Sequence, residues 1–386
     1  MKVSKIAICF GIFLISVGCG QEKTALQMGE DFLAEGDLWN ARAAFRQVVK
    51  EDTYNVRGNF YLAFLEPVVI ITGYDSPLRT PFFKLVEALK AEGGLASQPA
   101  VSSQHAFVSL LAKFLPLQYL RYIAYSPRPG VIELRSFTKE KLIPAIDQGI
   151  AHAKVLFENK DLRHTLDASK WGWPGLVTDH PEMDWGDAML LKSALYSMRA
   201  MAEVILAYNL TDLFEIAEKL DKSPDKSPMK IVALIKSYPN FATKQESDHL
   251  VQAKGHLATS LDALRDAISS IVREDDEQAN DLLPKDKLPV KFEETVQTLR
   301  ESLEAEKEVK WYVKAESEKE PIEILLRLDL SKFFGSGSDD LKGWLPQFDT
   351  AGRLTSYPDL TFGGISPQGD LVALFCSGMQ SREWCP

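Results

Sequence analysis

The chain has 386 residues, of which 45% are hydrophobic and 25% are charged, a composition typical of a globular protein with a substantial core. Its formal net charge of −10 disfavours nucleic acid as a partner, because a nucleic-acid-binding face must neutralise phosphates with basic side chains. The same negative charge disfavours electrostatic adhesion to anionic lipid. The length leaves room for two domains or for one large helical array.

The first twenty residues have the pattern of an export signal. Two lysines precede an apolar run over 6–17 that is too short to span a bilayer, and the small residue Gly18 stands directly before Cys19. This segment resembles the signal of bacterial lipoproteins, although Ser16 stands where that signal usually has Leu, Val or Ile. The resemblance implies cleavage after residue 18 and acylation of Cys19. The alternative is an ordinary signal peptide cleaved nearby, with Cys19 incidental.

Acylation of Cys19 would anchor the protein to the cell envelope, since more than one acyl chain gives stable attachment to a membrane. Gly20 follows the cysteine. A residue other than Asp at this position resembles lipoproteins that are sorted to the outer membrane of Gram-negative bacteria. We therefore expect a lipid-anchored protein at the outer membrane, facing the periplasm.

Four cysteines occur in the chain, and two of them lie in or directly after the export signal. The remaining pair, Cys376 and Cys385, is isolated near the end of the chain, which in an exported protein predicts a disulfide. It would tie down a short tail and contribute about 2–3 kcal/mol at most. The alternatives are two free thiols or a metal pair, and the metal is disfavoured because structural zinc takes four ligands.

Residues 25–55 predict two amphipathic helices that break near Gly36. Small and aromatic residues alternate in them at Gly29, Phe32, Ala41 and Phe45. The spacing resembles one tetratricopeptide (TPR) repeat, which implies that the small residues let the two helices approach and the aromatic residues fill the space towards the next helices. A second copy would begin near Val56, but Pro67 interrupts its register. The alternative is an ordinary helical hairpin.

The chain after the hairpin is largely helical. Apolar periodicity and breakers predict helices over 82–91, 104–122, 138–159, 185–208, 210–220, 229–236, 245–275 and 292–309. The helix over 185–208 is apolar on almost every face, so we expect it at the centre of the core, with Asp184 as its N-cap and Asp187 completing a capping box. Alternation over 321–334 predicts a half-buried strand, with a short helix as the alternative.

The predicted fold class is mainly α: an irregular helical array that begins with the TPR-like hairpin and ends in a small extension of loops and short strands. The tail over 328–364 resembles one found in uncharacterised exported bacterial proteins, which carries no assigned function. The predicted segments are a signal peptide over 1–18, the lipidated cysteine and tether over 19–24, a helical domain over 25–222, a long-helix region over 229–320 and the extension over 321–386.

A loop rich in tryptophan and acidic residues is the candidate ligand-binding site. Its candidate residues are Trp171, Trp173, His180, Glu182, Asp184, Trp185 and Asp187. Exposed indoles can stack on a sugar or dock a partner, whereas the alternative is that they pin the loop to the core. The acids match no known metal-binding spacing, and no metal or cofactor is predicted. Glu182 with Asp184 or Asp187 is the carboxylate pair available for glycan hydrolysis.

The sequence contains no nucleophile elbow, Walker loop, dinucleotide fingerprint or zinc-protease motif. We therefore expect a non-catalytic, lipid-anchored envelope protein that binds a protein or solute partner through helical surfaces. The expected partners are the membrane through the anchor, an envelope protein, and a glycan or small solute. The alternatives are a periplasmic solute-binding lipoprotein of an uptake system and a cell-envelope glycan hydrolase that uses the loop over 171–187.

Overall fold

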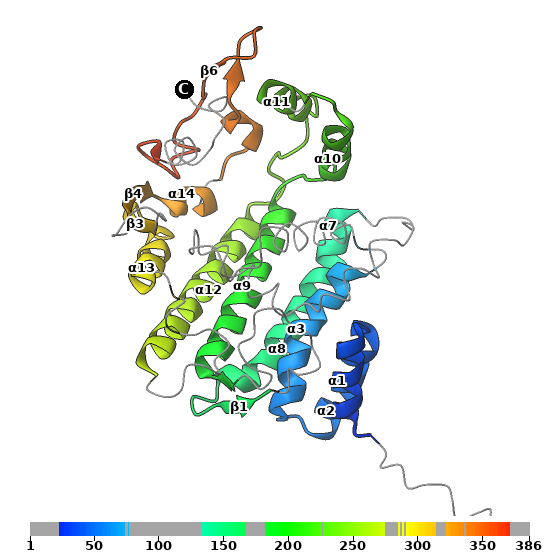
Figure 1. Cartoon of the computed structure of the whole chain (residues 1–386). Coiled ribbons are helices and arrows are strands. Elements are labelled where there is room, and N and C mark those ends of the chain that lie inside the picture. Colours follow the sequence, from blue (N-terminus) through cyan, green and yellow to red (C-terminus); the bar gives the residue numbers. More distant parts are fainter. Residues whose placement is uncertain are drawn as a thin grey trace, which may run out of the picture.

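A computed structural model describes residues 23–73, 76, 133–166, 182–225, 227–274, 285, 288, 291–313, 322–335 and 337–370. Within these residues the chain is mainly helical and forms three two-stranded antiparallel sheets, which confirms the predicted mainly α class (Figure 1). The predicted signal peptide, Cys19, the pair Cys376 and Cys385, and the helices expected over 82–91 and 104–122 lie outside the described residues.

The elements follow one another in the chain with these bounds. The helices are α1 Ala25–Glu35, α2 Leu38–Glu51, α3 Val56–Thr72, α7 Leu134–Phe137, a π-helical turn η1 Thr138–Leu142, α8 Ile143–Phe157, α9 Trp185–Ala207, α10 Leu213–Lys222, α11 Pro228–Lys236, α12 Asp248–Arg273, α13 Phe292–Ser302, α14 Leu330–Gly335 and a 3₁₀ turn η4 Leu341–Trp344. The strands are β1 Arg163–Thr165, β2 Glu182–Asp184, β3 Lys307–Val313, β4 Ile322–Leu328, β5 Gln347–Phe348 and β6 Leu354–Ser356.

The larger elements form a succession in which each packs on the next. From one edge of the molecule to the other the order is α1, α2, α3, α8, α9, α12, α13 and then the β3–β4 hairpin (Figure 1). Most neighbours in this order are also neighbours along the chain, so the array is built largely from local pairings. The division into domains at 222 and 320 stays a prediction.

The hairpin of α1 and α2 is built by strong local signals. Thr24 and Gln27 form a capping box at the start of α1, and Gly36 ends the helix with a φ of 81°. A left-handed residue at this position favours glycine, which has no Cβ to clash. Asp37 then caps α2 by accepting a hydrogen bond from the backbone of Asn40. The predicted break near Gly36 is confirmed.

Helix α3 runs without a break through Pro67, the residue that was expected to interrupt the register of a second TPR-like copy. Proline has no N–H, so it leaves the carbonyl of Ala63, four residues earlier, without its usual helical donor. Nearly every residue from Gly58 to Thr72 is buried, and the helix is held on all sides by its neighbours. Tertiary packing therefore outweighs the local cost of the proline.

A second proline shapes the start of α8. The helix predicted over 138–159 is present from Leu134 to Phe157, but it contains a π-helical turn in which the N–H of Ile143 donates to the carbonyl of Thr138. Pro144 follows directly, at the second position of α8, where it cannot donate. The π-helical turn and the proline thus stand side by side in a helix that continues from Leu134 to Phe157.

Helix α9 lies at the centre, as predicted, between α8 and α12 (Figure 1). Met189 packs near Ile271 and Ala207 near Leu250, so α9 and α12 are antiparallel. Between them, the hydroxyls of Ser193 and Ser197 lie 3.0 Å and 2.7 Å from that of Ser260. Small side chains at this contact allow the two helices to approach closely.

The chain changes character after Ser302. The helix predicted over 292–309 was wrong beyond this residue, because β3 begins at Lys307. Val309 pairs with Leu326 of β4, and both side chains are buried under α13. The strand predicted over 321–334 is confirmed for Ile322–Leu328, after which the chain forms α14. The tail contains the short strands β5 and β6, as expected for an extension of loops and short strands.

Candidate functional site

The described part of the predicted ligand-binding loop is the junction of β2 with α9. Asp184 accepts a hydrogen bond from the backbone N–H of Asp187 (2.9 Å), and Asp187 accepts one from the backbone N–H of Asp184 (3.2 Å). These two bonds form the predicted capping box, which is confirmed. Glu182 lies in β2 opposite Thr165 of β1. Both capping carboxylates therefore satisfy backbone groups at a helix start.

Trp185, the first residue of α9, is half-buried and pins this helix to α8. Its indole N–H donates to the carbonyl oxygen of Phe157 over 3.0 Å, and its side chain packs against the buried cluster that includes Met189 of α9 and Ile271 of α12. An indole held at both its polar and its apolar parts is a packing residue. Trp171, Trp173 and His180 lie outside the described residues, so ligand binding by this loop stays a prediction.

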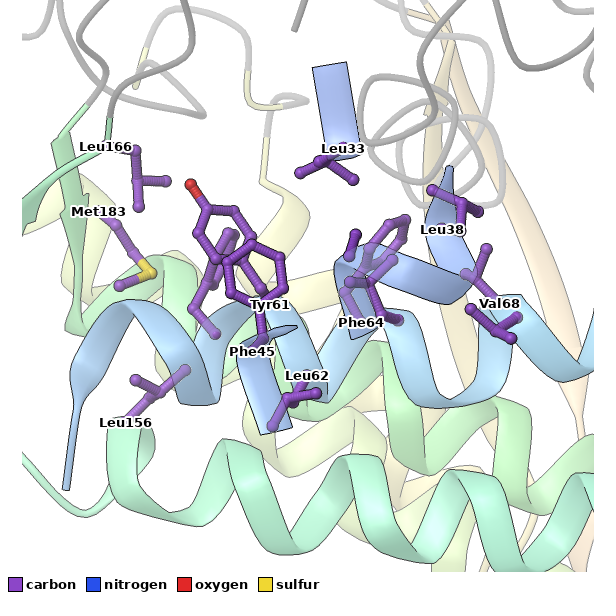
Figure 2. Packing of buried hydrophobic residues seen from close by; sticks show 14 of the residues in the cluster. Leu33, Leu38, Phe45, Tyr61, Leu62, Phe64, Val68, Leu156, Leu166 and Met183 are labelled. Atoms are coloured by element: carbon purple, nitrogen blue, oxygen red, sulfur yellow. The ribbon is translucent and has the colours of Figure 1, made fainter. Parts of the chain in front are cut away.

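The packing of the α1–α2 hairpin on α3 forms a second candidate site (Figure 2). Phe45 of α2 is fully buried and stacks on Tyr61 of α3, with ring centroids 4.3 Å apart. A Cβ on Gly29 would stand 2.6 Å from the Phe45 ring, so only glycine lets α1 approach at this point. Gly29 and Phe45 thus have the roles expected of them: the glycine lets the helices approach, and the phenylalanine fills the space towards α3. The likeness of the hairpin to a TPR repeat itself stays a prediction.

Ion pairs with buried carboxylates and partly exposed arginines hold the same interface. Glu66 of α3, 1% exposed, accepts two hydrogen bonds of 2.7 Å from Arg46 of α2 and a longer one of 3.4 Å from Arg42. Glu30 of α1 pairs with Arg57 of α3. A bidentate arginine is the geometry that best compensates a carboxylate for its loss of water. These pairs fix α1 and α2 on α3.

Trp39 and Arg42 form a cation–π pair on the outer face of α2. The indole of Trp39 is 50% exposed, and the guanidinium carbon of Arg42 lies 4.6 Å from its ring centroid. Burial lowers the pKa of Arg42, and the nearby charge of Glu66 opposes that effect. Tryptophan and arginine are the side chains most enriched at the energetic centres of protein interfaces. We call this pair the Trp39–Arg42 surface.

A third polar cluster joins α8, α9 and α12. The buried carboxylate of Glu203 lies 2.5 Å from Nδ1 of His249 and also pairs with Arg199, which reaches Asp147 over 2.9 Å. Burial and the charge of Arg199 lower the pKa of the neighbouring His256. No local pattern in the sequence reveals this cluster, because its members lie far apart in the chain, on three different helices.

Two further properties bear on function. In the described part of the chain, no group of His, Cys, Asp and Glu side chains has an arrangement that could hold a metal ion. No helix among the described residues is both long enough and apolar enough to cross a bilayer. Comparison with known proteins adds no assignment, since no family model, curated protein or solved structure matches the chain.

Proposed function

We propose that this protein is a non-catalytic, lipid-anchored component of the cell envelope that binds a protein partner through its helical surfaces. The observation that carries the proposal is the Trp39–Arg42 surface, which places an exposed indole and a guanidinium together on α2. The signal-like segment before Cys19 supports the anchoring, and Gly20 supports an outer-membrane location facing the periplasm.

The surface is rigidly supported, which favours binding. Helix α2 is held on α3 by the buried Phe45 and by the ion pair of Arg46 with Glu66. A partner that covers Trp39 would therefore bind a preorganised surface, and α2 would lose little conformational entropy on binding. Arg42 is itself mostly buried and pairs with Glu66, so the exposed part of this surface is the Trp39 indole, which favours an apolar or aromatic segment of the partner.

Co-purification from envelope extracts tests the proposal. The full-length protein is cross-linked in membranes, solubilised and compared with a Trp39→Ala variant and a matched Met201→Ala variant, which alters an exposed side chain on α9. We expect Trp39→Ala to weaken capture of the partner about tenfold or more, as interface tryptophans do. Equal capture by both variants, or no specific partner for the wild type, would overturn partner binding through α2.

The alternative of a different class is glycan hydrolysis at the loop over 171–187, and the alternative of a solute-binding lipoprotein uses the same loop. The described carboxylates of Asp184 and Asp187 cap α9, which favours the non-catalytic proposal. Replacing Glu182 by Gln tests the hydrolase alternative, because this change should abolish the turnover of glycan by a hydrolase. A solute binder would instead show stabilisation against heat by its solute.

A further inference from the structure

We propose that the tether-proximal end of the α1–α2 hairpin, formed by Met28 and by the turn over 52–55 with Tyr54 at its tip, rests on the lipid surface. The inference rests on the proposed acylation of Cys19 and extends it, because it assigns a face of the folded protein to the bilayer. Three observations carry it: the length of the tether, the shape of the turn and the exposure of its side chains.

The tether is too short to hold the fold far from the membrane. Only residues 20–24 separate Cys19 from Ala25, the first residue of α1. The Cα atoms of Cys19 and Ala25 are therefore six residues apart along the chain, a separation that spans at most about 20 Å when fully extended. The acyl chains of Cys19 would lie in the bilayer, so the start of α1 would stay within about this distance of the headgroups.

The α2–α3 turn lies at the same end of the hairpin as the start of α1. Helices α1 and α2 are joined by the short connection at Gly36 and pack on each other, so they are antiparallel (Figure 1). The end of α2 and the turn that follows it therefore lie beside the first turn of α1. A membrane that holds the start of α1 faces this turn as well.

The turn presents Tyr54 outward on a well-defined backbone. The backbone N–H of Tyr54 donates to the side chain of Asp52 (3.1 Å), and the Asn59 amide donates to the carbonyl of Thr53 (2.8 Å). The Asn55 side chain caps α3. On this frame the Tyr54 side chain is 79% exposed, and Met28 on the adjacent turn of α1 is 40% exposed. Tyrosine favours the membrane interface, where its ring is apolar and its hydroxyl remains wet.

Charge at this end decides the kind of lipid. Lys23 pairs with Asp31 over 2.7 Å, and Lys50 is followed by Glu51 and Asp52. These five groups leave no excess of positive charge, so anionic lipid is not what attracts the hairpin. The surface that fits is zwitterionic phospholipid at the headgroup level, with Tyr54 and Met28 making the contact.

Hydroxyl-radical footprinting with mass spectrometry tests the contact directly. The purified lipidated protein is reconstituted in vesicles of phosphatidylcholine, and the oxidation rates of Tyr54 and Met28 are compared with those of the Cys19→Ala protein mixed with the same vesicles. Met201 is the internal control, because it is 64% exposed and its neighbour Ala202 packs at the opposite end of α3, beside Ile71. We expect Tyr54 and Met28 to be protected several-fold by anchoring and Met201 to be unchanged.

Flotation of the same samples separates this inference from the anchoring on which it rests. If the wild type floats with vesicles, Cys19→Ala does not, and Tyr54 and Met28 are protected, the contact is supported. Flotation of the wild type with no protection at these two residues overturns the contact and leaves the anchor standing. Failure of the wild type to float overturns both. Protection that disappears at high salt would contradict a contact made without electrostatic attraction.

Discussion

Gly149 of α8 lies so close to the carbonyl oxygen of Ala63 in α3 that a Cβ at residue 149 would stand only 2.7 Å from it. This carbonyl is the one that Pro67 leaves without a helical N–H donor. The same added Cβ would also touch the Pro67 ring at 3.4 Å. A glycine on one helix thus matches a proline on the other, and the two helices pack closely at this point.

This contact predicts that Gly149→Ala destabilises the fold, even though alanine is the better helix former. Overpacking of a close helix contact costs about 1–3 kcal/mol. The matched control is Gly255→Ala in α12, where an added Cβ meets nothing within 4 Å. That change should stabilise by about 0.5–1 kcal/mol. Urea unfolding followed by circular dichroism measures both, and two changes of the same sign would contradict the packing.

Glu66→Gln should destabilise the hairpin interface. The variant removes the buried carboxylate charge that Arg46 and Arg42 face, and because Arg46 is half exposed to water and can be solvated, the cost is about 1–3 kcal/mol. Glu158→Gln is the control, since its pair with Lys154 is exposed on both sides and contributes about 0.5 kcal/mol or less. Chemical denaturation of the three proteins gives the comparison. Similar unfolding midpoints for the two variants would rule out a structural role for the Arg46–Glu66 pair.

Asp184→Ala should weaken the start of α9 by about 0.5–2 kcal/mol, because it removes the acceptor of the capping box. Asp212→Ala is the matched control, as Asp212 is the N-cap of α10 but makes no capping hydrogen bond through its side chain. Hydrogen exchange at the first amides of α9 and α10 resolves the two effects. Faster exchange should appear in α9 of the first variant, and its absence there would contradict the cap.

Stability should fall as the pH falls through the ordinary histidine range. Burial lowers the pKa of His152, His164 and His256 below the usual value. Below about pH 6.5 the unfolded chain therefore binds protons that the folded protein does not, and folding loses stability until the folded pKa is passed. His152→Gln should reduce this slope. NMR titration of the ring protons checks the direction, and an upward pKa shift for these histidines would refute it.

Local signals in the sequence were sufficient for several elements. The glycine that ends α1, the capping box of Asp184 and Asp187, and the apolar surround of α9 all depend on residues within a few positions of one another. Their physical causes act within one turn or one helix. They are a left-handed cap, a helix start whose N–H groups need acceptors, and a helix that must be buried on all sides. The amphipathic α12 was predicted for the same reason.

The candidate site was only partly predictable for the opposite reason. Trp185 could be placed at the start of α9 from its neighbours, but its bond to Phe157 joins residues in separate helices. Glu66 stands out in the sequence as an acid inside an apolar run, yet nothing near it identifies Arg46 as its partner. The exposure of Trp39 and Tyr54 likewise depends on the tertiary packing, because α3 covers some faces of the α1–α2 hairpin and leaves others in solvent.

By itself, the sequence determined a mainly helical chain, the break near Gly36 and the cap of Asp184 with Asp187. It also gave an export signal before Cys19 as an expectation. Only the tertiary structure decided that α3 continues through Pro67, that the chain after Ser302 forms β3 instead of more helix, and that Glu203 meets His249. Each of these outcomes depends on partners distant in the chain. Their packing, strand pairing and charge compensation outweigh local preferences that are worth only about 1–3 kcal/mol.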